Sequence, residues 1–330
     1  MAQGTRGEAL RAPGPSRERR VMANERRSAD WRWFTAGILV MVLAVLMMHH
    51  YQAQGSRVER LARQHRRLEV VERMARDLAR AAEAEKSAVM AATDEESEAF
   101  AADARAGTAA VAAGRDELAA LLPAGGDQEK ELLARFSAAL AEYEQLDREL
   151  LDLAVRNTNL KASALAFGPA AESAGALDEA LSRLLARMAD SNSPHARRIM
   201  LMASDARDGT LRTLALLPAH IAADNAAHMD SLEAGFAAED RRVRANLDHL
   251  AVLVPPAGRA DLAAATAACD RFAEVKGRIL ELSRQNTNVR SLALSLNQKR
   301  LVTVKCQDAL AALEQSVRRE PVPGAPANPR

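Results

Sequence analysis

Two stretches of the chain carry apolar residues at every third or fourth position, and the two stretches share one register. The first covers Leu133 to Leu153 and Leu177 to Met188, and the second covers Leu262 to Leu282 and Cys306 to Val317. Each apolar position of the second stretch lies 129 residues after its counterpart. Spacings of three and four that persist over several turns are typical of helices that pack along a seam. The pattern therefore predicts a tandem repeat of helices.

The tripeptide Asn-Thr-Asn interrupts both stretches, at Asn157–Asn159 and at Asn286–Asn288. Asparagine favours helix ends and turns because its side chain bonds to the nearby backbone. We therefore expect a turn at each tripeptide, after which the fourth helix of a repeat packs antiparallel to the third. A helix that passes through the tripeptide is the alternative.

Caps and breaks predict the other helices of the first repeat. A helix is expected from residue 52 to about Ala92, and Thr93 with the acidic residues after it is typical of the N-cap of a second helix, which ends near Leu122. The segment Pro123–Asp127 separates this second helix from the third. The Gly168-Pro169 pair should kink the fourth helix or delay its start.

The second repeat follows the same plan after a polar joint at residues 190–194. Ser193 is expected to cap the next helix, with Pro194 at its first position. The remaining predicted elements are a helix over about 194–217, a helix over about 222–254, a break at Pro255–Gly258 and two helices that flank Asn286. The pattern thus predicts two antiparallel four-helix bundles, residues 52–190 and residues 191–319.

Composition supports this all-α fold. Aromatic residues make up 3% of the chain, and no run alternates apolar and polar residues as strands do. Abundant alanine, leucine and charged residues are typical of long helices. The net charge of +1 argues against a nucleic-acid-binding protein, which needs a basic surface for the phosphates. Only two cysteines are present, which excludes a disulfide framework, a haem-attachment motif and a paired-cysteine zinc site.

Residues 33–51 form the longest apolar run, and no charged residue lies between Arg32 and Arg57. The apolar centre is about 15 residues long, and Trp and Tyr residues, which favour membrane interfaces, flank it. We expect one transmembrane helix there, with the basic N-terminus in the cytoplasm and the rest of the chain in the periplasm, anchored to a bacterial inner membrane. The alternative is a cleaved signal peptide, with Ala53 and Gly55 as the small residues before the cut.

The two ends of the chain lack apolar periodicity. Residues 1–32 carry eight arginines and scattered glycine and proline, and residues 320–330 contain four prolines. Such segments cannot bury enough apolar surface to offset the entropy of ordering them. We predict that both are disordered tails, and Met22 is an alternative start of the chain.

The membrane helix, the bundles and the junctions that begin at Asn157 and Asn286 together resemble the four-helix-bundle sensor domain of bacterial methyl-accepting chemotaxis receptors. The Gly168-Pro169 pair is similar to the proline-bearing start of the last helix in that family. The resemblance covers residues 52–319 in two copies. It implies a periplasmic bundle that senses a ligand or a stress, is often dimeric and transmits small displacements. The second membrane span and the cytoplasmic signalling half of the family are missing, and no ligand-binding residue of the family is matched.

His220, Asp224 and His228 fall four residues apart, a spacing that places three metal ligands on one face of a helix. No fourth ligand from another helix is evident, so the expected role of these residues is that of polar groups at a solvated or interfacial helix start. The chain also has no glycine-rich phosphate loop, no GxSxG motif and no cysteine beside a histidine base. We therefore predict no catalytic residue, no cofactor and no metal ligand.

Cys269 and Cys306 lie symmetrically about the second Asn-Thr-Asn tripeptide, so an antiparallel hairpin would bring them level. Leu140 and Leu177 occupy these positions in the first repeat, which favours two buried thiols that pack as small apolar groups. An oxidising periplasm would instead favour a disulfide if the Cα separation allows one. The sequence leaves both alternatives open.

These features lead us to expect a membrane-anchored sensory or adaptor module that binds a small ligand or a partner receptor and self-associates through its helices. The alternative is a membrane-tethered spacer without a ligand. A sensor should bury polar or charged groups around a pocket between helices, whereas a spacer should have a dry apolar core. Four arginines after the predicted span would face anionic lipid headgroups or an acidic partner, or form a solvated helix face: Arg60, Arg63, Arg66 and Arg67.

Overall fold

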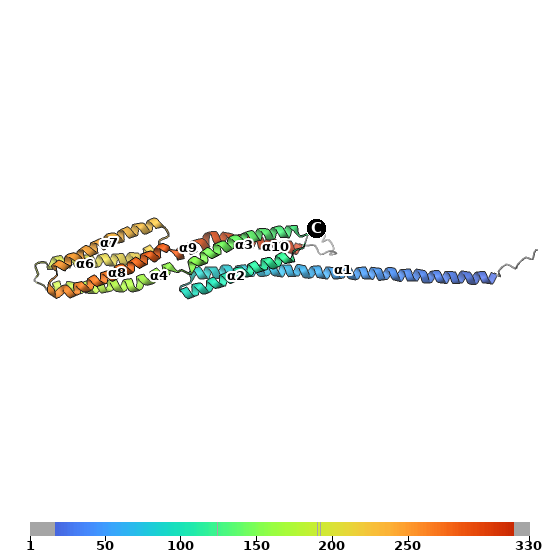
Figure 1. Ribbon diagram of the computed structural model, residues 1–330, viewed down its shortest axis with the longest axis horizontal. Helices are drawn as coiled ribbons and strands as arrows, with labels where there is room; N and C mark the ends of the chain where they lie inside the picture. The colour runs from blue at the N-terminus through green and yellow to red at the C-terminus, as the bar shows by residue number, and fades with distance from the viewer. Residues whose placement is uncertain (1–16, 124, 190, 192, 320–330) are drawn as a thin grey trace, which may run out of the picture. The chain divides into compact units, whose positions relative to one another are not determined.

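The computed structural model describes residues 17–123, 125–189, 191 and 193–319, and it describes side chains in these ranges except at 17–36 and 50–57. Every regular element in this part of the chain is helical (Figure 1). The predicted all-α class is therefore confirmed. Residues 67–319 form a compact unit, which contains two bundles.

The first half of the chain contains five α-helices and one π-helical turn: α1 (Arg17–Met90), α2 (Asp94–Leu121), α3 (Asp127–Ala154), α4 (Thr158–Leu165), η1 (Ala166–Ala170) and α5 (Ala171–Ala189). The second half repeats this order with a short 3-10 turn, η2, added: α6 (Ala196–Ile221), α7 (Ala226–Leu253), η2 (Pro256–Gly258), α8 (Arg259–Gln285), α9 (Thr287–Leu294), η3 (Ser295–Lys299) and α10 (Arg300–Arg319). The turn η3 is π-helical, as η1 is.

The helix starts agree with the caps in one repeat and differ in the other. Thr93 caps α2 as predicted, because its hydroxyl accepts from the Glu96 N–H at 3.1 Å. Ser193 does not cap α6, which begins three residues later at Ala196. The hydroxyl of Ser193 accepts instead from the His195 N–H at 3.3 Å, and this local bond delays the helix.

The Asn-Thr-Asn tripeptides do not turn the chain back on itself, so the predicted hairpins are wrong. Helix α3 packs against α9 and α10, while α8 packs against α4 and α5 (Figure 1). A single residue, Asn286, separates α8 from α9, whereas an antiparallel pair of helices needs a loop of roughly two to five residues. The chain therefore continues from one bundle into the other at each tripeptide.

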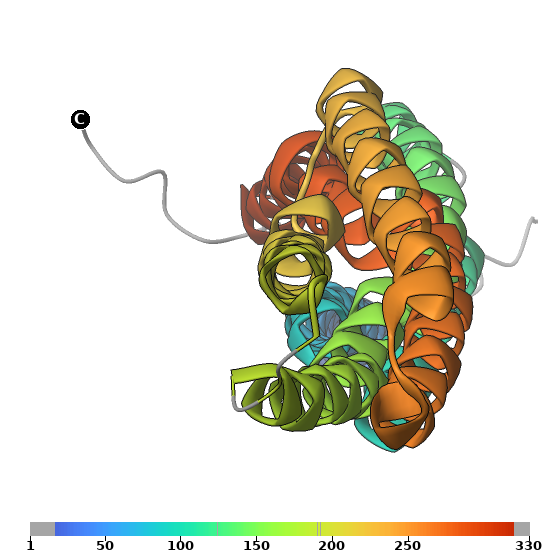
Figure 2. The ribbon, with the colours of Figure 1, turned by 90° about the vertical axis from the view of Figure 1, so that its left-hand side faces the viewer.

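Two long segments, residues 127–189 and residues 259–319, thus run through both bundles. We call the bundle of α1, α2, α3 and α9–η3–α10 the first bundle, and that of α4–η1–α5, α6, α7 and α8 the second bundle. The predicted division into residues 52–190 and 191–319 is corrected accordingly, because each bundle takes its fourth helix from the other repeat. Figure 2 shows the helices of the second bundle from their end.

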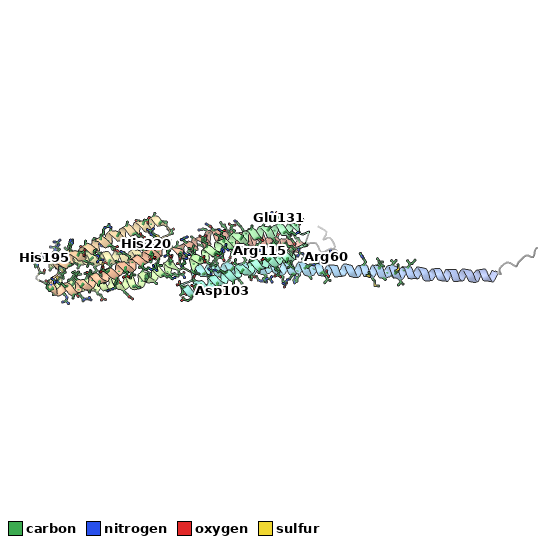
Figure 3. The ribbon with its side chains drawn as sticks, viewed as in Figure 1. Arg60, Asp103, Arg115, Glu131, His195 and His220 are labelled. Carbon is green, nitrogen blue, oxygen red and sulfur yellow. The ribbon has the colours of Figure 1, made fainter. Side chains whose placement is uncertain are left out.

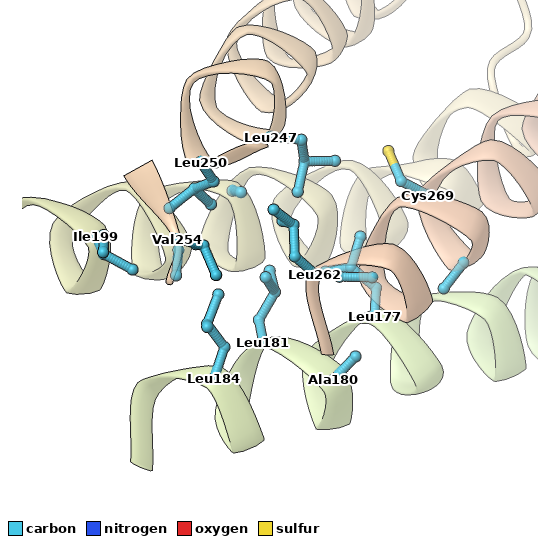
Figure 4. Close-up of a cluster of buried hydrophobic side chains, with 14 of the residues drawn as sticks. Leu177, Ala180, Leu181, Leu184, Ile199, Leu247, Leu250, Val254, Leu262 and Cys269 are labelled. Atoms are coloured by element: carbon cyan, nitrogen blue, oxygen red, sulfur yellow. The ribbon is translucent and has the colours of Figure 1, made fainter. Parts of the chain in front are cut away.

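Each bundle has an apolar core made by all four of its helices. The core of the first bundle includes Val70, Met74, Val111, Leu118, Phe136, Leu140, Cys306 and Leu310. The core of the second bundle includes Leu177, Leu181, Leu184, Ile199, Leu247, Leu250 and Leu262, which Figure 4 shows in contact across the helices. The three- and four-residue spacing read from the sequence places these side chains on the buried faces.

Helix α1 begins at Arg17, so the structure places residues 17–32 in a helix, where the sequence predicts part of a disordered tail. The stretch 17–32 contains no proline or glycine, and its arginine, glutamate and alanine residues extend a helix readily once it has formed. The predicted tails at residues 1–16 and 320–330 lie outside the described residues.

Within the described ranges, no helix combines the length and the apolarity that crossing a membrane requires. Side chains of the predicted span, residues 33–51, are described only at 37–49, and all of these are exposed.

Candidate functional site

The two Asn-Thr-Asn tripeptides pair with each other where the long segments pass between the bundles. The N–H of Thr158 donates to the hydroxyl of Thr287 at 3.2 Å, and the N–H of Thr287 donates to the hydroxyl of Thr158 at 3.1 Å. Asn159 and Asn288 repeat this exchange, since each backbone N–H donates to the Oδ1 of the other, at 3.1 and 3.2 Å. The junction is therefore a reciprocal hydrogen-bonded pair between equivalent residues of the two repeats.

Asn157 and Asn286 place the kink in each long segment. They are the only described non-glycine residues with positive φ, at 51° and 53°, in the left-handed region that asparagine tolerates better than other L-residues do. The side-chain amide of Asn157 donates to Asp94 at the start of α2 (2.9 Å), and that of Asn286 donates to the carbonyl of Ala223 after α6 (2.9 Å). Asn157 thus bonds its junction to the start of α2 in the first bundle. Asn286 bonds its junction to the end of α6 in the second bundle.

A π-helical turn follows each junction at the same distance. The turn η1 holds Pro169, which lacks an N–H and so cannot complete the α-helical ladder. The Gly168-Pro169 pair thus lies in a π-helical turn within a continuous helical run, whereas the sequence predicts a kink or a delayed helix start. The turn η3 occupies the equivalent place without proline, and no sequence signal pointed to it. Single π-helical turns inside α-helices are frequent at functional sites, so η1 and η3 mark two candidate sites.

A cluster of charged side chains is buried beside η3 in the first bundle. The ammonium of Lys299 lies 2.5 Å from Asp147 Oδ1 and donates to the carbonyl of Tyr143 at 3.1 Å. The ammonium also lies over the Tyr143 ring, 3.2 Å from its centroid. Only 1% of Lys299 and 3% of Asp147 is exposed to solvent. An ion pair sealed in this way pays a large desolvation cost, which its direct contact offsets only in part.

Glu85 of α1 adds a third charged group to the same core. It is 2% exposed, and the hydroxyl of Ser295 in η3 donates to its Oε1 at 2.6 Å. Burial raises the pKa of the Glu85 carboxyl, and burial also lowers the pKa of the Lys299 ammonium, although Asp147 opposes the second shift. The cluster therefore joins α1, α3 and η3 through polar contacts inside an otherwise apolar core.

Apolar side chains occupy three of the four equivalent positions in the second bundle. Phe272 stands in the place of Tyr143, and Ala166 and Ala170 stand in the places of Ser295 and Lys299. These three side chains belong to one buried apolar cluster. Lys276 of α8 stands in the place of Asp147; it is also buried, and it pairs with Asp240 of α7, which is half exposed. The two bundles thus share a backbone plan, and the first bundle buries both members of its ion pair beside the π-helical turn.

The second bundle carries a groove of about 610 Å³ beside η1, between α4–η1–α5 and α8. Leu165 contributes to its apolar lining, and two carboxylates and two guanidinium groups also line it: Glu172, Glu274, Arg271 and Arg278. At the equivalent place of the first bundle, an ion pair between Lys305 and Glu142 (3.0 Å) bridges the two helices. The equivalent residues here are Ala176 and Arg271, which form no such bridge, so the groove stays open.

The predicted grouping of His220, Asp224 and His228 on one helix is wrong, because α6 ends at Ile221 and α7 begins at Ala226. Figure 3 labels His220, which lies on α6. Its side chain is fully buried, and its ring nitrogens lie 2.9 Å from the Ser283 hydroxyl and 2.9 Å from Glu233. Through these contacts His220 joins α6 to α8 and α7. Across the described chain, no group of three His, Cys, Asp or Glu side chains is placed to hold a metal ion.

Both cysteines are free and buried, and they lie in different bundles. Cys269 belongs to the core of the second bundle, and Cys306 to the core of the first. A disulfide between them is therefore excluded in this fold, because the hairpin that would bring them level does not form. Burial raises the pKa of the Cys306 thiol to about 11, as expected for a thiol that packs as an apolar group.

The arginines near the start of the bundle have different environments. Arg67 is 4% exposed and pairs with Glu129 at 2.6 Å, so it is not part of a lipid-facing or partner-facing surface. Arg63 is exposed and lies near Glu59, one turn earlier in α1. The prediction of one arginine face is thus wrong for Arg67.

Compared with known proteins, the chain matches no protein-family model and no curated protein sequence.

Proposed function

We propose that this chain is a sensory or adaptor module of the chemoreceptor type, anchored to a bacterial inner membrane, whose periplasmic bundles respond to a small ligand or a partner receptor. One observation carries the proposal. The groove of the second bundle has one wall on each long segment, and both long segments also build the first bundle. A molecule that fills the groove thus contacts two helical segments that reach the other bundle.

The junctions suggest how a displacement would travel. A ligand between α5 and α8 changes the spacing of the two helices, and α8 continues through Asn286 into α9 of the first bundle. Helix α4 connects to α3 through Asn157 in the same way. The two junctions bond to each other through Thr158 and Thr287, so a displacement of one long segment is transmitted to the other.

The buried charges favour a sensor over a spacer. A spacer needs only apolar cores, and Ala166, Ala170 and Phe272 of the second bundle show that the backbone accepts apolar side chains in the places of Ser295, Lys299 and Tyr143. The Lys299–Asp147 pair of the first bundle carries a desolvation cost that an apolar pair would avoid. Buried polar groups of this kind are best explained where one particular arrangement of helices has to be favoured.

The proposed anchor rests on the apolar run in α1. Its side chains from Ile38 to Met48 are exposed on all sides of the helix, and an apolar helix of this kind needs a covering of lipid or protein. The basic residues before the run favour an N-terminus on the cytoplasmic side. We also propose that the chain self-associates through its helices, and we propose no nucleic-acid partner.

Thermal unfolding of the full chain in detergent micelles, with and without added compounds, tests the ligand. The panel consists of amino acids, organic acids, nucleosides and divalent metal ions. A ligand present at 100 times its dissociation constant stabilises the folded state by about 2.7 kcal/mol, so we expect a selective rise in the unfolding temperature for one class.

Ala176→Trp would fill the groove and should abolish that rise. Lys305→Trp is the matched control, because Lys305 is the equivalent residue of the first bundle and is exposed. If no compound raises the unfolding temperature, or if Ala176→Trp leaves the rise intact, the groove is not a ligand site and the spacer becomes the better explanation.

A further inference from the structure

Glu85 differs from the other buried charges because no cation lies within ion-pair distance of it among the described residues. Asp147 already occupies the Lys299 ammonium, at 2.5 Å. Ser295, a neutral donor, is the hydrogen-bond partner of Glu85. A carboxylate in this position would be a buried negative charge with incomplete compensation, which is among the most costly groups in a protein interior.

Few groups around Glu85 can stabilise a negative charge on its carboxyl group. Helix α2 contributes Ala101 and Ala104 to the neighbouring core, and α3 contributes the negative charge of Asp147. Lys299 lies on the second long segment, and its ammonium group already forms an ion pair with Asp147. On α1 itself, the adjacent Lys86 is exposed. The buried ionisable groups around this contact thus include two carboxyl groups, one ammonium group and the Tyr143 phenol, whose pKa is raised by burial and by the nearby carboxylates.

We propose that Glu85 is a proton-binding site that makes the contact between α1 and the π-helical turn η3 depend on pH. With a proton bound, the cluster is a neutral carboxyl group beside a neutral Asp147–Lys299 pair. When the proton leaves, the core holds one unbalanced negative charge beside the neutral donor Ser295, and the helices around this contact separate enough to admit water. This inference does not need a ligand in the groove of the second bundle, so it stands apart from the proposed function.

The position of Glu85 explains why its protonation would matter beyond the cluster. Ser295 belongs to the second long segment, which continues through Asn286 into α8 of the second bundle. A change at the contact between Glu85 and Ser295 therefore acts on a segment that both bundles share. The proton would be a second input to the same helices that line the groove.

The raised pKa of Glu85 fixes the sign of the effect on stability. A carboxyl group whose folded-state pKa exceeds its unfolded value keeps its proton longer in the folded state. Its contribution to stability is full below the unfolded pKa and falls as pH rises toward the folded pKa. We expect the wild-type protein to lose stability over this range relative to Glu85→Gln, which mimics the protonated side chain at every pH.

Infrared spectroscopy of the full chain in detergent micelles tests the proton directly. In a pH series, the folded protein should show the C=O stretch of a protonated carboxyl group at pH values where exposed carboxyl groups have lost their protons, and this band should disappear in Glu85→Gln. Glu83→Gln is the matched control, because Glu83 lies on the same helix and is exposed. The band should remain in this control.

Thermal unfolding between pH 5 and pH 9 provides the second measurement. The difference in unfolding temperature between Glu85→Gln and the wild type should grow in favour of the variant as pH rises, and Glu83→Gln should follow the wild type. If the folded wild type shows no protonated-carboxyl band above the pH at which exposed carboxyl groups titrate, or if Glu85→Gln keeps the band, the inference is wrong.

Discussion

At the scale of single residues, the most unusual feature is a lysine in the middle of a helical core. Lys299 is held by Asp147, by the carbonyl of Tyr143 and by the face of the Tyr143 ring. The three-and-four spacing of the sequence identified the apolar neighbours of these residues correctly, including Leu140 and Leu310. It gave no indication that charged residues would share the core, because a charged residue is normally expected on the solvated face.

Lys299→Ala should destabilise the protein strongly. The substitution leaves Asp147 buried without its partner, and breaking a buried ion pair from one side costs about 3–5 kcal/mol. Lys305→Ala is the control, since the exposed pair of Lys305 with Glu142 is expected to contribute at most about 1 kcal/mol. Urea unfolding of both variants measures the difference. Equal losses of stability would mean that the buried pair has no special role.

At the scale of elements, the junctions decide how the helices are distributed. Asparagine at 157 and 286 was correctly interpreted as an interruption of the helices, but the interruption is a kink rather than a reversal. Sequence patterns locate a break and say little about the direction of the chain after it. The direction here depends on the reciprocal bonds of Thr158 with Thr287, which involve residues 129 positions apart.

Asn286→Ala and Asn286→Gly together separate the backbone role of Asn286 from its side-chain role. Alanine at φ 53° costs about 1–2 kcal/mol of backbone strain and also loses the bond to the Ala223 carbonyl. Glycine loses the bond but relieves the strain, so we expect Asn286→Gly to retain more stability than Asn286→Ala. Urea unfolding compares them. Equal stability of the two variants would show that the left-handed conformation contributes nothing.

At the scale of the whole molecule, the described unit from residue 67 to residue 319 is two bundles that share two long segments. A tandem repeat would ordinarily give two domains with one linker between them. Here each long segment supplies one helix to each bundle. The first segment contains α3 and α5, and the second contains α8 and α10. Neither bundle can lose its long segments without disturbing the other.

We therefore expect a single unfolding transition for the two bundles. Leu313→Ala in the first core and Leu181→Ala in the second should each lower the same transition, by about 2–5 kcal/mol, because both leucines are fully buried. Leu201→Ala, at a residue that is 64% exposed, is the control and should change little. Differential scanning calorimetry measures the number of transitions. Two transitions, each sensitive to only one of the core substitutions, would contradict the coupling.

The sequence by itself determined the features that depend on local physics. Helical periodicity and the N-cap at Thr93 follow from the spacing and the conformational preferences of neighbouring residues, and the structure agrees with both. The 129-residue repeat was also visible, because equivalent positions keep the same apolar spacing.

Only the tertiary structure decided which helix completes which bundle, where Cys269 and Cys306 lie, and that Glu85, Asp147 and Lys299 meet in one core. These features depend on contacts between residues far apart in the chain, 152 positions for Asp147 and Lys299. The apolar pattern is compatible with either pairing of the equivalent helices, since the two repeats present similar buried faces. A one-residue junction that cannot reverse the chain selects the pairing, and its effect appears only when the backbone is built in three dimensions.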